Sequence, residues 1–167
     1  MNRLNVVLLE PEIPQNTGNI ARTCVATHTA LHLIEPFGFK INDKNLKRAG
    51  LDYWQYLEVF YYKNIDEFYE KHPNAKCRYF TTKGQKCYSE SDYSGDCYLF
   101  FGKETKGLPE DLLIKNKDDC VRLPMFQEIR SLNLANSVAV AVYEALRQNG
   151  FEELNKKGKF PTKKDIL

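Results

Sequence analysis

The chain has 167 residues, enough for one domain built around a single hydrophobic core. Hydrophobic residues make up 43% of it and charged residues 28%, which excludes disordered, collagen-like and mucin-like proteins. The formal charge is only +2, so any surface that binds nucleic acid has to be a local patch.

The first apolar segment is too short for a membrane protein or a secreted one. It covers residues 4–9 and stops at Glu10 and Pro11. A signal peptide needs roughly 7–15 apolar residues and a transmembrane helix about 20. We therefore expect a protein without a membrane segment that works in the cytoplasm.

Short apolar runs then alternate with helical patterns. The predicted strands cover residues 4–9, 31–34, 58–61, 77–82, 96–101 and 120–123. The predicted helices cover residues 17–29, 43–50, 64–72 and 108–115, and a longer one runs from residue 134 to a stop at Gly150. This alternation predicts one α/β domain over residues 1–150, with a mostly parallel sheet of about six strands flanked by helices. Residues 151–167 form a basic tail that we expect to be solvated.

The cysteines and histidines give no metal-binding pattern. Five cysteines form an odd set without C-x-x-C spacing, so we expect reduced and mostly buried thiols. Cys24, His28 and His32 recur every fourth residue, but the helical pattern fades near Thr29. The three side chains would then not share a helical face, and we expect no metal site.

The glycine spacing excludes two nucleotide-binding motifs. No two glycines are separated by a single residue, so the dinucleotide fingerprint G-x-G-x-x-G is absent. The segment Gly102-Lys103-Glu104 lacks both the Ser or Thr and the upstream glycine of a phosphate-binding P-loop. No G-x-S-x-G segment indicates a serine hydrolase either.

Three loops after predicted strands lie where open α/β sheets place their ligand sites. In the first, Asn16 or Thr17 should cap a helix, with Arg22 about one turn inside it. The second covers residues 101–109, and the third covers residues 123–137. Each loop taken alone also fits an ordinary capped turn.

The second and third loops add two more expectations. Gly102, which has no Cβ, would let the backbone of the second loop approach a ligand. Ser131 or Asn133 would cap the long helix after the third loop.

Together, these loops resemble the three signature motifs of the SPOUT RNA methyltransferases. They read N-T-G-N-I-A-R at residues 16–22, F-G-K-E-T-K-G-L-P at residues 101–109 and L-P-M-x(4)-R-S-L-N-L-A-N-S-V-A at residues 123–139. The resemblance covers residues 5–150 and is closest to the TrmL (YibK-like) tRNA 2′-O-methyltransferases. That subgroup shares E-P-E-I-P at 10–14, I-E-P-x-G-F at 34–39, K-R-A-G-L-D-Y at 47–53 and T-T-K-G at 81–84.

The resemblance implies a SPOUT fold, with a C-terminal trefoil knot that binds S-adenosylmethionine, and no metal. It also implies that Arg22 and Asn16 are catalytic, and leaves open whether Arg22 accepts the ribose proton or acts as a cation, since a guanidinium stays protonated. The cofactor pocket carried over from the family comprises Phe80, Thr81, Gly102, Glu104, Leu123, Ser131 and Leu132.

The implied substrate is the pyrimidine at position 34, the wobble nucleotide, of leucine tRNAs. We expect four residues to bind RNA: Lys47, Arg48, Lys103 and Arg130. The first two belong to a basic segment, residues 40–48, that aromatic residues follow. The family also implies a homodimer, for which the long helix with Tyr143 is the candidate interface. Two alternatives remain: a non-catalytic RNA-binding module, or a 2′-O-methyltransferase for another tRNA or rRNA site.

Overall fold

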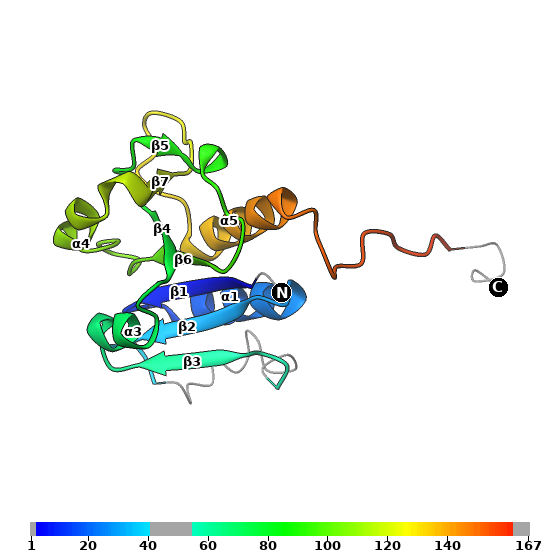
Figure 1. Ribbon diagram of the computed structural model, residues 1–167, viewed down its shortest axis with the longest axis horizontal. Coiled ribbons are helices and arrows are strands. Elements are labelled where there is room, and N and C mark those ends of the chain that lie inside the picture. The colour runs from blue at the N-terminus through cyan, green and yellow to red at the C-terminus, as the bar shows by residue number, and fades with distance from the viewer. Residues whose placement is uncertain (1–2, 41–54, 162–167) are drawn as a thin grey trace.

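The structure is a computed structural model that describes residues 3–40 and 55–161. Seven strands and four α-helices alternate along these residues (Figure 1). The strands are β1 (Leu4–Leu9), β2 (Ala30–Ile34), β3 (Val59–Tyr62), β4 (Lys76–Phe80), β5 (Lys86–Cys87), β6 (Cys97–Phe101) and β7 (Cys120–Arg122). The α-helices are α1 (Pro14–Ala26), α3 (Ile65–Lys71), α4 (Glu110–Lys115) and α5 (Leu134–Gln148), and two short 3₁₀ turns cover Tyr88–Glu90 and Lys117–Asp119.

All seven strands form one parallel sheet in the order β3-β2-β1-β6-β4-β7-β5. The predicted α/β class and parallel sheet are confirmed, with one strand more than expected. The additional strand, β5, has two residues and pairs with β7 at the edge of the sheet. A strand this short has no apolar run for a sequence pattern to reveal.

Helices cover both faces of the sheet, and β1 shows why its sequence is apolar at every position. Val6 and Leu8 belong to the core beneath α1 and α5, whereas Val7 and Leu9 belong to the core beneath α3 and α4. Successive side chains of a strand point to opposite faces, so a strand covered on both faces needs a continuous apolar run.

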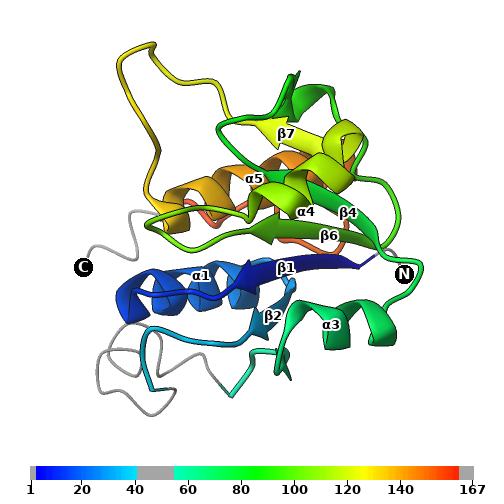
Figure 2. The same cartoon turned by 90° about the vertical axis from the view of Figure 1, so that its left-hand side faces the viewer.

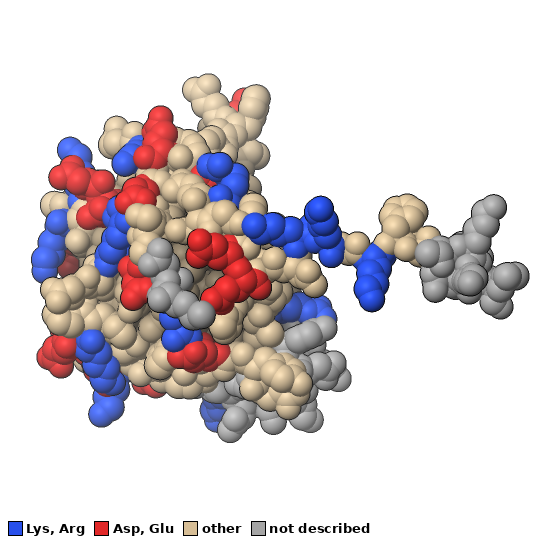
Figure 3. All heavy atoms as spheres, turned by 45° about the vertical axis from the view of Figure 1, so that its right-hand side comes forward, with Lys and Arg blue, Asp and Glu red and all other residues tan. Residues whose placement is uncertain are grey.

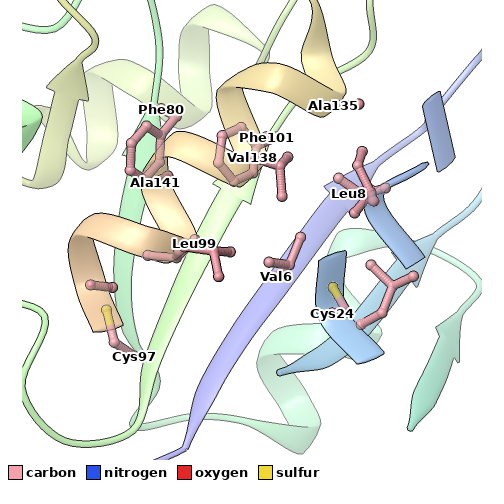
Figure 4. Close-up of a cluster of buried hydrophobic side chains, with 14 of the residues drawn as sticks. Val6, Leu8, Cys24, Phe80, Cys97, Leu99, Phe101, Ala135, Val138 and Ala141 are labelled. Carbon is pink, nitrogen blue, oxygen red and sulfur yellow. The ribbon is translucent and has the colours of Figure 1, made fainter. Parts of the chain in front are cut away.

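Helix α5 follows the predicted apolar stripe. Val138, Ala141, Val142 and Ala145 are fully buried against the sheet, beside Leu99 and Phe101 of β6 (Figure 4). Burying one valine side chain of this kind contributes about 1.5–3 kcal/mol.

Both predicted ends of α5 are confirmed. The side chain of Asn133 accepts a hydrogen bond from the backbone N–H of Asn136 at 3.2 Å and caps the start of the helix, while Ser131 does not. Gly150, with φ +67°, follows its last turn.

The start of α1 differs from the prediction. The helix begins at Pro14 and not at Thr17, because proline at the first helical position has the right φ and lacks an N–H that would be unpaired there. Ile13 is the N-cap, so neither Asn16 nor Thr17 caps the helix. Arg22 is therefore more than two turns inside α1, not one.

All five cysteines are free thiols, and four of them are buried, as predicted. The predicted helix at residues 43–50 lies outside the described residues. In the part of the chain that the structure describes, no helix has the length and apolar character needed to cross a membrane.

Candidate functional site

The candidate site lies where four neighbouring strands end. In the order β1-β6-β4-β7 the strands are adjacent and parallel, so the loops after them emerge at one edge of the sheet. Figure 2 shows the long connection from β7 to α5 on the same side as the loops after β1 and β6. Together with the first turns of α1 and α5, these loops enclose a cavity of about 580 Å³. This volume lies within the range of roughly 300–1,000 Å³ typical of small-molecule sites.

Most of the residues selected from the sequence line this one cavity. All seven expected cofactor-binding residues contribute to its wall, and Asn16, Lys103 and Arg130 do so as well. Lys47 and Arg48 lie outside the described residues. Arg22 is exposed on α1 and is not among the lining residues. It lies six residues beyond Asn16, about 9 Å along the helix axis.

The walls combine apolar side chains with polar loops. Phe80 stacks on Phe101 at 4.7 Å between ring centroids, and Leu123 and Leu132 line the cavity from the loop after β7. Apolar walls of this kind suit a flat ring system such as adenine, while backbone N–H and C=O groups of the loops suit its polar edge.

Gly102 is required for a different reason from the one expected. A Cβ at this position would lie 2.0 Å from the carbonyl carbon of Gly107 and 2.2 Å from the backbone nitrogen of Leu108. The loop closes on itself there, with Gly107 N–H donating to the Lys103 carbonyl at 2.8 Å. Gly102 therefore allows the loop to fold back on its own backbone, and the expected approach of a ligand is not its first constraint.

Glu104 holds the start of α1. One carboxylate oxygen accepts the backbone N–H of Glu12 at 2.8 Å, and the other accepts the N–H of Ile13 and the side-chain amide of Asn16, both at 3.1 Å. The first N–H groups of a helix have no partner within it, and negative charge is favoured at that end. A residue of the second motif thus supplies the cap that the local sequence lacks.

The loop after β1 also binds the loop after β6 through its own carboxylates. The carboxylate of Glu12 accepts the backbone N–H of Thr105 at 3.0 Å and its hydroxyl at 2.8 Å. The hydroxyl, with the N–H, holds the pKa of the Glu12 carboxyl below its usual value. Glu10 pairs with Lys103, and this hydrogen bond raises the pKa of the Lys103 ammonium. The first and second motif loops are therefore joined by contacts in both directions.

Asn16 joins all three motifs. Asn133 uses its side-chain oxygen to cap α5, so its NH₂ group is the one that donates to Asn16 Oδ1, at 3.0 Å. The NH₂ group of Asn16 then faces Glu104, which as a carboxylate can only accept. The orientation of both amides is fixed by this chain of contacts, because reversing either one would place two donors or two acceptors against each other.

The sequence did not assign several residues of this site. The cavity is also lined by Thr82, Lys83, Lys106 and Met125. The first two belong to the T-T-K-G string, but the sequence gave them no role in the site. Glu12 and Thr105 lie within the family strings, but the sequence assigned them no role, because their contacts join residues 93 positions apart.

A family model for the SpoU rRNA methylase family matches residues 3–143, and the chain belongs to this family. Two relatives are similar to this chain over most of its length. The tRNA (cytidine(34)-2′-O)-methyltransferase of Saccharophagus degradans is 47% identical over 148 residues, which cover 88% of this chain and 96% of the relative. A Geobacillus stearothermophilus protein provisionally named for the same reaction is 51% identical over 155 residues, which cover 91% of this chain and 99% of the relative.

Solved structures share the fold. One, from a study of the 2-OH methylation of C/U34 on tRNA, is 42% identical with a TM-score of 0.85, covering 89% of this chain and 97% of that one. The AdoMet complex of the SpoU methyltransferase AviRb from Streptomyces viridochromogenes has a TM-score of 0.77 at 23% identity, covering 89% of this chain and 58% of that one. These matches confirm the predicted SPOUT fold class.

Proposed function

We propose that this protein transfers the methyl group of S-adenosylmethionine to the ribose 2′-oxygen of nucleotide 34 in tRNA, in the cytoplasm. One observation carries the proposal: three loops distant in the sequence line one cavity and are joined there through Asn16. Relatives about 50% identical over most of the chain are named for this reaction, which supports the choice of substrate.

The cavity has the features that the cofactor needs. Its seven expected lining residues give it apolar walls and polar loop backbone, within a volume suited to a small molecule. When bound, S-adenosylmethionine supplies a methyl group activated by its positively charged sulfur. We place the cofactor among these residues, within the knot that the SPOUT resemblance implies.

The chain's own residues then have to orient the ribose and stabilise negative charge on its 2′-oxygen. Asn16, held by Glu104 and Asn133, is fixed at the cavity wall and is proposed to orient the nucleotide. Arg22 is proposed to hold a phosphate and to stabilise the developing alkoxide as a cation.

The RNA is proposed to lie across the mouth of the cavity. Arg130 is exposed there, and Lys103 lines the wall while paired with Glu10. Lys47 and Arg48 complete the proposed RNA-binding set. The leucine tRNAs are the proposed substrates because the residues shared with the TrmL-like subgroup indicate them.

A homodimer through α5 is also part of the proposal. Val140 and Tyr143 lie on the outer side of this helix with 42% and 51% of their surface exposed. Exposed apolar side chains on a helix whose other face is buried are typical of an interface.

Methyl transfer from labelled S-adenosylmethionine into bulk tRNA tests the proposal. We expect wild-type protein to label tRNA and not rRNA. Asn16→Asp, which places a carboxylate against Glu104, should lower the rate at least tenfold. Asn74→Asp is the control and should not, because Asn74 is exposed and does not line the cavity. RNA binding without any transfer would support the non-catalytic module instead, and labelling of rRNA alone would support another site of methylation.

A further inference from the structure

The positive charge of this chain is concentrated in its C-terminal segment. Residues 155–167 contain five lysines and one aspartate, a net charge of +4, while the whole chain carries +2. Residues 1–154 therefore carry −2. The domain that encloses the cavity has no overall attraction for a polyanion, and the excess of positive charge lies outside it.

The described part of this segment leaves the domain. After Leu154 the chain extends away from α5 without regular secondary structure (Figure 1). Lys156, Lys157 and Lys159 are exposed, and Figure 3 shows basic side chains along the described part of the segment that projects from the domain. Within the described residues, none of the three has an ion pair or a hydrogen bond.

Several lysines of the domain are in the opposite situation. Lys71, Lys76, Lys83 and Lys103 each pair with a carboxylate that partly neutralises them. The tail lysines have no such carboxylate partner among the described residues, and Phe160 beside them has 92% of its surface exposed. Unpaired cations next to an exposed ring match what single-stranded and looped RNA offers, namely phosphates together with unstacked bases.

We propose that the segment 155–161 is an RNA-binding arm, whose lysines contact tRNA phosphates and whose Phe160 stacks on an unpaired base. The inference rests on the proposed function, because it takes tRNA as the substrate. Helix α5 begins at the cavity, where Leu134 and Ser137 line it, and its 15 residues span about 22 Å. The arm therefore starts far from the cavity of the same chain, and it increases the affinity for tRNA without touching the reacting atoms.

The test compares two triple variants with equal net charge. The arm variant carries Lys156→Gln, Lys157→Gln and Lys159→Gln. The control variant carries Lys63→Gln, Lys115→Gln and Lys117→Gln, three exposed lysines of the domain. The affinity of each for a leucine tRNA transcript is measured by fluorescence anisotropy at several salt concentrations.

The slope of log K against log salt concentration is negative, and the loss of three phosphate contacts should make it less steep by about 2–3. We expect the arm variant to show this reduced slope, with tRNA affinity about tenfold lower or more near 0.15 M salt. The control variant should keep the wild-type slope. Both should bind S-adenosylmethionine like wild type and should keep kcat within twofold at saturating tRNA.

Replacement of the same three lysines by arginine should restore affinity, because arginine keeps the charge. Equal tRNA affinities of the arm and control variants would overturn the inference. So would wild-type binding to phosphatidylserine vesicles that the arm variant loses while its tRNA affinity stays unchanged, since that would assign the arm to a membrane surface. If wild-type protein binds tRNA through the arm but transfers no methyl group, the proposed function fails while the arm stands.

Discussion

Asn133 donates its side-chain amide to Asn16 Oδ1 at 3.0 Å, although 117 positions separate the two residues in the chain. The same Asn133 caps α5 with its oxygen, so a single amide fixes both the start of a helix and the orientation of a cavity residue. The contact allows the structural and functional contributions of Asn133 to be measured separately.

Asn133→Asp should separate them. Aspartate keeps the oxygen that caps α5, so the free energy of unfolding should change by less than about 1 kcal/mol. It loses the NH₂ donor and turns an acceptor toward Asn16 Oδ1, so the rate of methyl transfer should fall at least tenfold. Thermal unfolding and single-turnover methylation measure the two effects. Loss of stability in proportion to the loss of rate would show that the contact is only structural.

Gly102→Ala tests why the second motif needs its first glycine. The added Cβ would meet backbone atoms of Gly107 and Leu108, so the loop has to move. We expect a loss of about 1–3 kcal/mol in the free energy of unfolding and weaker binding of S-adenosylmethionine in calorimetry. Gly158→Ala is the control, because a Cβ there meets nothing within 4 Å. Unchanged stability of Gly102→Ala would contradict the observed loop closure.

A buried histidine predicts how stability depends on pH. His32 is hydrogen bonded to the Tyr62 hydroxyl at 2.8 Å and to Asn5 Oδ1 at 3.1 Å. Burial, with a smaller contribution from His72, lowers the pKa of His32 to about 3. The unfolded chain takes up this proton near pH 6.5, so between pH 6.5 and 3 the unfolded state binds more protons and stability falls as the pH falls.

His32→Gln removes this dependence because glutamine does not titrate. Relative to pH 7.5, wild type should lose about 2 kcal/mol more of its free energy of unfolding at pH 5 than the variant loses. Urea unfolding at the two pH values gives the difference, and His72 titrates in both proteins. Parallel pH profiles would mean that His32 is not kept neutral by the fold.

Arg22 can be tested by two substitutions. Arg22→Ala should leave S-adenosylmethionine affinity nearly unchanged and remove methyl transfer. Arg22→Lys keeps the charge, so a purely electrostatic role predicts activity within about one to two orders of magnitude of wild type. A role that needs the planar fork of donors predicts that lysine is as inactive as alanine. Full activity of Arg22→Ala would remove the residue from the mechanism.

Six of the seven strands could be predicted from the sequence, chiefly because burial on both faces leaves continuous apolar runs, as in β1. The support for the start of α1 could not, because the N–H groups of Glu12 and Ile13, just before the helix, are bound by Glu104, 92 positions beyond Glu12. The wall of the cavity was predicted through family motifs. The contacts of Glu12 with Thr105 were not, since they exist only once two loops meet.

The structural reason for a glycine at position 102 could not be predicted either, because it also depends on a contact that forms only in the folded loop. A glycine in a loop indicates that something comes close, and only the folded backbone shows that Gly107 is the neighbour. His32 carried no clear signal either, because its partners Asn5 and Tyr62 lie on β1 and β3, on either side of its own strand.

The proposed reaction is methyl transfer to the ribose of nucleotide 34. A leucine tRNA transcript incubated with the protein and S-adenosylmethionine, then cleaved by ribonuclease and analysed by mass spectrometry, tests it most directly. We expect one added methyl group of about 14 Da on the ribose of nucleotide 34, and none on a transcript whose 2′-hydroxyl at that position is replaced by hydrogen. Methylation on a base, or on the ribose of any other nucleotide, would contradict it.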